Sequence, residues 1–139
     1  MKTFLGCKSL TSLDVSGFDT SSADDMAGMF KGCSQLQTLD VSGFDTSKVT
    51  RMCSMFAGCE SLTYVDVSGF ETGLVDRFDW MFLDCASLTA LDLSSFQFDA
   101  ATQMDKMFCG CASLTNIGCT ITVPESASSE DMYTGSGLE

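Results

Sequence analysis

Apolar side chains recur along this chain at a fixed spacing of 26 residues. Each unit has a cysteine with a leucine three residues later, and the cysteines are Cys7, Cys33, Cys59, Cys85 and Cys111. Later in each unit comes an apolar pair such as Met55-Phe56. A constant period of about 20–50 residues is typical of proteins in which one unit stacks on the next. The spacing therefore predicts a solenoid.

The first half of each unit has the pattern of a short strand. In the unit that starts at Cys59, Val65 and Val67 alternate with polar residues, as on a half-buried strand. Ser68-Gly69 follows as a turn signal, and Phe70 is one more apolar anchor. We expect stacked copies of this strand to pair in parallel.

The second half of each unit has the pattern of a short helix. Val49, Met52 and Met55 share the spacing of one apolar helical face. Ser47 lies where a helix-capping residue is expected, and Gly58 is suited to a left-handed cap at the other end. We interpret the methionine and phenylalanine positions as core rather than as a cofactor site.

These elements predict an α/β solenoid of about five strand–turn–helix units, with a parallel sheet on one face and helices on the other. Phe4 precedes Phe30 by 26 residues, so the solenoid, residues 1–117, is expected to begin within a repeat. Residues 118–133 lose the pattern and are predicted to be a C-terminal capping segment. Residues 134–139 are predicted to be a flexible tail, with an ending that resembles a cloning remnant. We expect the chain to be part of a longer protein.

The chain is strongly acidic, with 19 Asp and Glu residues against 7 Lys and Arg. A net charge of −12 argues against nucleic acid or anionic lipid as a partner, because both would be repelled. No apolar run reaches the roughly 18 residues that a membrane span requires, so no direct membrane insertion is expected.

The chain has eight cysteines and no histidine, so cysteines would have to supply the ligands of a typical zinc site. A zinc site would need close cysteine pairs, and Cys109-Gly110-Cys111 is the nearest approach, so no metal site is predicted. Disulfides between stacked units are geometrically possible. We favour buried thiols, since free cysteine packs as a small apolar residue. Cys53 lies beside the core pattern and is predicted to be exposed and reactive.

Acidic and hydroxyl side chains form two columns on the outer face of the predicted sheet. The columns comprise Asp14, Asp40, Asp66 and Asp92, with Ser16, Ser42, Ser68 and Ser94. Neighbouring carboxylates should raise one another's pKa or attract cations. One interpretation is a polar recognition strip. The alternative is that each Asp accepts hydrogen bonds from the turn that follows it.

Other polar and aromatic positions complete the candidate surfaces. Asp19, Asp45 and Glu71 are predicted to serve helix starts. Tyr64 interrupts the outward strand face and is a candidate contact anchor, as is Trp80 on the helix side.

One stretch carries a family resemblance in full: Gly32-Cys33-x-x-Leu36-x-x-Leu39-Asp40-Val41-Ser42-Gly43-Phe44-Asp45-Thr46-Ser47-Lys48-Val49. It resembles the BspA-like leucine-rich repeat of bacterial surface proteins, which also occurs in mycoplasma lipoproteins. The resemblance implies a leucine-rich-repeat solenoid, an extracellular or cell-surface location, and adhesion to host proteins or other cells. It implies no enzymatic activity. Thr72-Gly73 and Phe98-Asp99 depart from the motif.

An enzyme is not expected, because a uniform column of carboxylates offers no division into acid and base. The first hypothesis is a non-enzymatic recognition or adhesion module that binds a protein or glycan on a host or neighbouring cell, without a cofactor. Its binding residues would be the Asp and Ser columns together with Tyr64. A structural spacer and a calcium-dependent carbohydrate-binding module are the alternatives.

Overall fold

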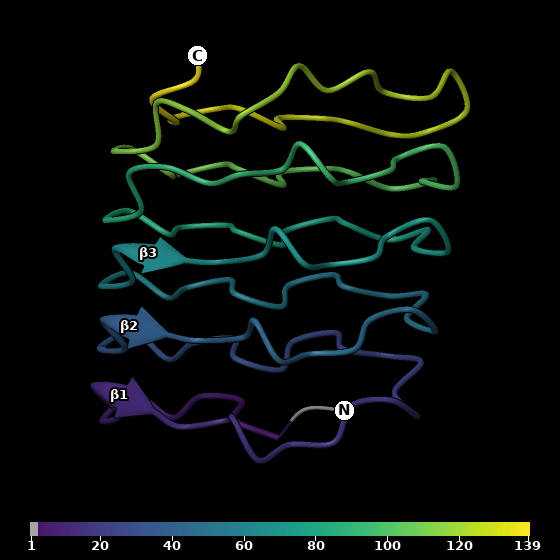
Figure 1. Cartoon of the computed structure of the whole chain (residues 1–139). Helices are drawn as coiled ribbons and strands as arrows, with labels where there is room; N and C mark the ends of the chain where they lie inside the picture. Colours follow the sequence, from purple (N-terminus) through teal and green to yellow (C-terminus); the bar gives the residue numbers. More distant parts are fainter. Residues whose placement is uncertain (1–2) are drawn as a thin grey trace.

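The computed structural model describes residues 3–139. The chain winds into a stack of similar coils, with the N-terminal coil at one end and the C-terminal coil at the other (Figure 1). Three parallel strands in the order β1-β2-β3 line one edge: β1 (Ser12–Leu13), β2 (Thr38–Leu39) and β3 (Tyr64–Val65). Ser12 pairs with Thr38, and Thr38 pairs with Tyr64, so the 26-residue spacing is the register between coils.

The described residues contain no helix and three strands of two residues each, so the predicted α/β leucine-rich-repeat solenoid with helices on one face is wrong. The segment predicted to be a helix has two left-handed residues in each coil. In one coil these are Ser54 (φ 56°) and Gly58 (φ 74°), and in the next Trp80 (φ 59°) and Asp84 (φ 57°). A right-handed helix cannot continue through such residues.

In this segment, backbone hydrogen bonds to the next coil alternate with bonds that close turns within the same coil. The N–H groups of Met52, Ser54 and Phe56 donate to carbonyl oxygens 25 residues later, at 3.0, 3.0 and 2.9 Å. An isolated parallel bridge also joins Arg51 of this segment to Arg77 of the next coil. These N–H groups would bond to the preceding turn in a helix. Here the next coil accepts those hydrogen bonds instead.

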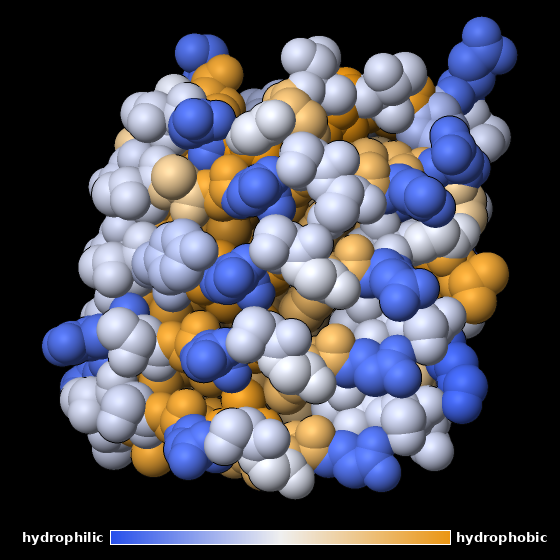
Figure 2. Space-filling model, in the orientation of Figure 1, coloured by the Kyte–Doolittle hydropathy of each residue, from blue (hydrophilic) through white to orange (hydrophobic). Residues whose placement is uncertain are grey.

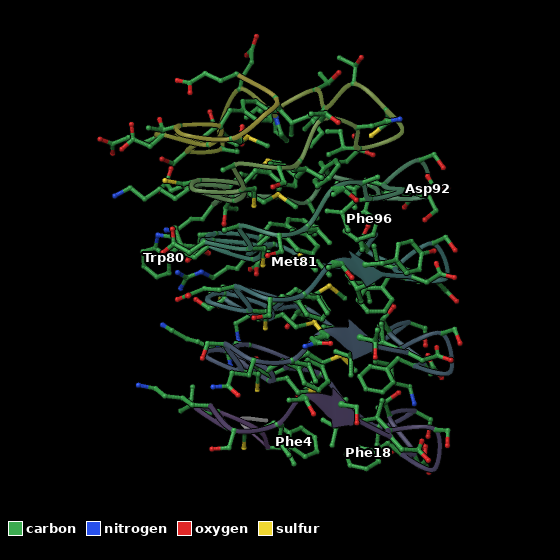
Figure 3. All side chains as sticks on the ribbon, turned by 90° about the vertical axis from the view of Figure 1, so that its left-hand side faces the viewer. Phe4, Phe18, Trp80, Met81, Asp92 and Phe96 are labelled. Atoms are coloured by element: carbon green, nitrogen blue, oxygen red, sulfur yellow. The ribbon has the colours of Figure 1, made fainter. Side chains whose placement is uncertain are left out.

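Apolar side chains from both edges of each coil fill the interior, as the sequence predicts for the methionine and phenylalanine positions. One aromatic ring from each coil stacks on the next, with centroids 5.4–5.9 Å apart and planes within 9°. This column comprises Phe4, Phe30, Phe56, Phe82, Phe108 and Tyr133. Figure 3 shows Met81 inside the stack and Phe4 in the coil at its N-terminal end. The column extends the apolar core along the stack.

A column of buried threonines adds polar links between coils. Thr46 is 2% exposed, and its hydroxyl donates to the Glu71 carbonyl at 3.1 Å and accepts from the Glu71 N–H at 2.7 Å. Thr20 and Thr72 make the same pair of bonds to the following coil. Each hydroxyl thereby satisfies both backbone groups of one residue in the next coil.

The C-terminal residues cover one end of the stack. Met132 is buried, its carbonyl accepts from the Phe108 N–H at 2.9 Å, and the Tyr133 ring ends the aromatic column. Residues 121–123 lie outside any strand. Beyond them, the Gly137 N–H donates to the Cys111 carbonyl at 3.1 Å. Across the described residues, no helix is long and apolar enough to cross a membrane.

Candidate functional site

A groove of about 610 Å³ runs across the outer face of β1, β2 and β3. Its lining comprises Ser12, Leu13, Asp14, Thr38, Leu39, Asp40, Ser42, Tyr64 and Asp66. Figure 2 shows a hydrophobic strip on this face, beside a column of hydrophilic residues. The groove therefore combines an apolar floor with carboxylates along one side.

The structure brings part of the predicted recognition strip together in this groove. Asp14, Asp40, Ser42, Tyr64 and Asp66 line it. The other predicted residues lie outside its lining, and these are Ser16, Ser68, Asp92 and Ser94. They continue the same two columns along the face.

Each aspartate of the column closes a turn with the serine two residues later. The Ser42 N–H and hydroxyl both donate to Asp40 Oδ1, at 2.9 and 2.6 Å. Ser68 binds Asp66, and Ser94 binds Asp92, in the same way at 3.0 and 2.6 Å. The alternative interpretation, that each Asp accepts hydrogen bonds from its turn, is thus confirmed. Within residues 3–139, no hydrogen bond reaches Oδ2 of Asp40.

These serine contacts determine the ionisation of the column. The Ser42 hydroxyl, and then its N–H, lower the pKa of Asp40, whereas repulsion from Asp14 opposes this only weakly. The pKa values of Asp14 and Asp92 are lowered by their own serines. Repulsion therefore acts on Asp40 in the predicted direction, but the serine hydrogen bonds outweigh it, and the pKa of all three carboxyls is lowered. They are fully ionised at neutral pH.

Tyr64 is the large aromatic residue of this face, with 60% of its surface exposed. It pairs with Thr38 in the β2–β3 register, at the position that Ser12 holds in β1. The floor beneath is apolar, because Leu39 is only 5% exposed and Leu13 packs partly against the core. A ring above an apolar floor and beside carboxylates suits a ligand that is both apolar and cationic.

The second acidic row forms turns rather than helix starts. The Ser21 and Ser47 hydroxyls donate to Asp19 and Asp45, each at 2.6 Å, and lower the pKa of those carboxyls. No helix follows either turn. The predicted helix-start role is therefore wrong. Glu71 lines a neighbouring depression of about 440 Å³.

Trp80 lies far from the groove. Figure 3 places Trp80 at one edge of the stack and Asp92 at the opposite edge. Trp80 is 41% exposed, and its backbone N–H donates to the Asp105 carbonyl at 2.9 Å. The two candidate anchors, Tyr64 and Trp80, therefore belong to different surfaces.

The cysteines are free thiols, and four of the five in the 26-residue series are buried: Cys33, Cys59, Cys85 and Cys111. The Cys59 thiol donates to the Phe30 carbonyl at 3.3 Å, and burial raises its pKa to about 12. Cys53 is half-buried, and burial raises its pKa as well. Cys53 is thus less exposed than predicted, and its raised pKa disfavours the reactive thiolate.

The described residues contain no group of three or more His, Cys, Asp or Glu side chains that could hold a metal ion. The column aspartates instead each bind the serine of their own turn. The oxygen atoms of the groove are thus arranged as a row of separate carboxylates.

A family described as a mycoplasma protein of unknown function, DUF285, matches residues 1–121. The chain belongs to this family. Comparison with curated proteins and with solved structures finds no match. The DUF285 match covers all of the coils that line the groove.

Two features of this DUF285 chain escaped the sequence reasoning. The first is the apolar floor, since the inward strand positions of Leu13 and Leu39 give no sign in the sequence that these residues also line a groove. The second is the buried threonine column. Thr20, Thr46 and Thr72 recur at the 26-residue spacing, and that recurrence was the available signal.

Proposed function

We propose that this chain is a non-enzymatic recognition module that binds a protein or glycan partner through the groove on its sheet face. The observation that carries the proposal is the exposed Tyr64 ring above an apolar floor, beside ionised carboxylates. Aromatic residues dominate the energetics of many binding surfaces. Stacked coils hold the groove in place, so binding would require little ordering of the protein.

The uniformity of the carboxylates supports binding over catalysis. Asp14 and Asp40 sit in equivalent turns, and the pKa of each is lowered for the same reason. Acid–base catalysis by two carboxyls needs environments that move their pKa values apart. A row of equivalent charges is suited to recognition.

The resemblance of the repeat motif to BspA-like surface proteins supports an adhesive role outside the cell. The location is part of the proposal, and surface labelling of the full-length protein on intact cells checks it. The spacer alternative predicts that the groove has no ligand. The calcium-dependent carbohydrate alternative predicts binding that chelation abolishes.

A screen of the purified chain against extracellular matrix proteins and a glycan array tests the proposal. We expect at least one binder whose affinity falls when Tyr64→Ala is introduced, by about 1–2 kcal/mol. Trp80→Ala is the matched control, since it removes an exposed aromatic ring from another surface. Binding that depends on Trp80 and not on Tyr64 would assign recognition to the opposite edge, and no binder at all would favour the spacer.

A further inference from the structure

The charge of the groove has one sign. Three carboxylates line it, from Asp14, Asp40 and Asp66, and no Lys or Arg among the described residues does so. Four of the seven basic side chains have partners elsewhere: Lys48 with the Ser21 carbonyl, Arg51 with Asp25, Arg77 with Asp79, and Lys106 with Asp131. Among the described residues, no basic side chain lines the groove to neutralise its negative potential.

The carboxylates are already oriented for a cationic partner. Oδ1 of Asp40 is held by the N–H and hydroxyl of Ser42, so the carboxylate is fixed while Oδ2 has no hydrogen bond within the described residues. Asp66 is held in the same way by Ser68. A fixed carboxylate loses little rotamer freedom when a guanidinium or ammonium group binds it.

The spacing of the column favours an extended polypeptide lying along the stack. Adjacent parallel strands are about 4.8 Å apart, so Asp14 and Asp66 lie two steps, or roughly 9.6 Å, apart. A polyproline II segment rises about 3.1 Å per residue and has three residues per turn, so every third side chain shares a face at about 9.3 Å. Two successive side chains on that face would therefore reach Asp14 and Asp66.

The apolar parts of the groove suit the same partner. Long basic side chains pack their aliphatic stems on apolar surface while the charged end reaches polar groups. Leu13 and Leu39 supply that surface. The exposed face of Tyr64 can accept a cation at short range.

We propose that the partner of this groove is an extended polypeptide segment with Arg or Lys at every third residue, lying along the column of Asp14, Asp40 and Asp66. This inference rests on the proposed recognition function and adds the chemical class of the partner. The negative charge of the groove, which a row of Arg or Lys side chains would complement, is the reason for assigning this class of partner.

A labelled peptide of three Arg-Pro-Pro units is the probe, and a Gln-Pro-Pro peptide of equal length is its neutral control. We expect the chain to bind the Arg peptide at least about tenfold more tightly, measured by fluorescence anisotropy at low salt. The double variant Asp40→Asn, Asp66→Asn should weaken Arg-peptide binding by about tenfold, because the amides keep the shape and remove the charge. Circular dichroism and thermal melting confirm that each variant is folded.

The matched control variant is Asp24→Asn, Asp99→Asn, which removes the same charge at exposed positions outside the groove lining. Its binding should stay within about twofold of the parent. An equal loss in both double variants would mean attraction by net charge alone and would overturn the inference. So would failure of the Arg peptide to bind.

Two outcomes separate this inference from the function on which it rests. If a neutral oligosaccharide or peptide binds in a Tyr64-dependent way and the Arg peptide does not, the recognition function stands and the cationic partner is wrong. If neither the peptides nor the wider screen yields a Tyr64-dependent ligand, both are wrong.

Discussion

At the scale of single residues, a serine two positions after each aspartate controls the carboxylate. The Ser42 hydroxyl lies 2.6 Å from Asp40 Oδ1 and is the largest cause of the lowered pKa of Asp40. Repulsion across coils acts through water, where screening makes it weak. The outward Asp column and the break at Tyr64 were predictable from alternation along the strand. The direction of the pKa change was not, because it depends on a contact within the turn.

We predict that Ser42→Ala raises the pKa of Asp40 toward the ordinary value of about 3.9. Removal of the hydroxyl deletes the strongest hydrogen bond to the ionised form. Carboxyl chemical shifts followed by NMR during a pH titration measure this change. Asp92, whose Ser94 is intact, is the internal control. An unchanged Asp40 titration would show that the N–H contact alone holds the pKa down.

The lowered pKa values of the column aspartates determine the direction in which the stability of the chain changes with pH. Folding lowers the pKa values of Asp14, Asp40 and Asp92, so their contribution to stability is present above about pH 3.9 and is lost as the pH falls through the folded values. Thermal melts should therefore show loss of stability on acidification. Ser42→Ala should make this acid dependence shallower.

At the scale of the element, the segment forms a coil rather than the expected helix because carbonyl oxygens of the next coil accept hydrogen bonds from several of its backbone N–H groups. The Phe56 N–H reaches the Met81 carbonyl at 2.9 Å, and the Gly58 N–H reaches Leu83 at 2.7 Å. Left-handed residues turn these groups toward the next coil. Glycine adopts that conformation freely, whereas Asp84 does so at φ 57° without that freedom.

We predict that Asp84→Gly stabilises the chain by about 0.5–1 kcal/mol, since relief of the left-handed conformation exceeds the added entropy of unfolded glycine. Gly32, Gly58 and Gly110 hold the equivalent positions in other coils. Asp99→Gly, at an exposed residue without positive φ, should instead destabilise by a similar amount. Urea denaturation of both variants measures the difference, and stabilisation in neither would contradict the conformational argument.

At the scale of the whole molecule, stability is carried from coil to coil. The Phe56 ring contacts Phe30 on one side and Phe82 on the other, at 5.7 and 5.4 Å. Tyr133 stacks on Phe108 alone and closes the column. In a stack where each unit touches only its neighbours, loss of a central contact interrupts two interfaces and loss of a terminal one interrupts one.

We therefore predict that Phe56→Ala lowers the free energy of unfolding by about 3–5 kcal/mol. Tyr133→Ala should cost less, about 1–3 kcal/mol, because its ring is only partly buried. Tyr133→Phe keeps the ring and is the control. Equal costs for the two alanine variants, measured by urea denaturation, would show that the end cap matters as much as a central coil.

The sequence by itself determined the 26-residue register, the inward methionine and phenylalanine positions, and the outward place of the Asp column and Tyr64. These follow from spacing, which a stack of equal units preserves. Only the tertiary structure decided between helix and coil. Val49, Met52 and Met55 have a spacing that suits a helical face and the observed coil equally well. The Met52 N–H gains its acceptor, the Arg77 carbonyl of the next coil, only once the coils have stacked, and no local pattern encodes that choice.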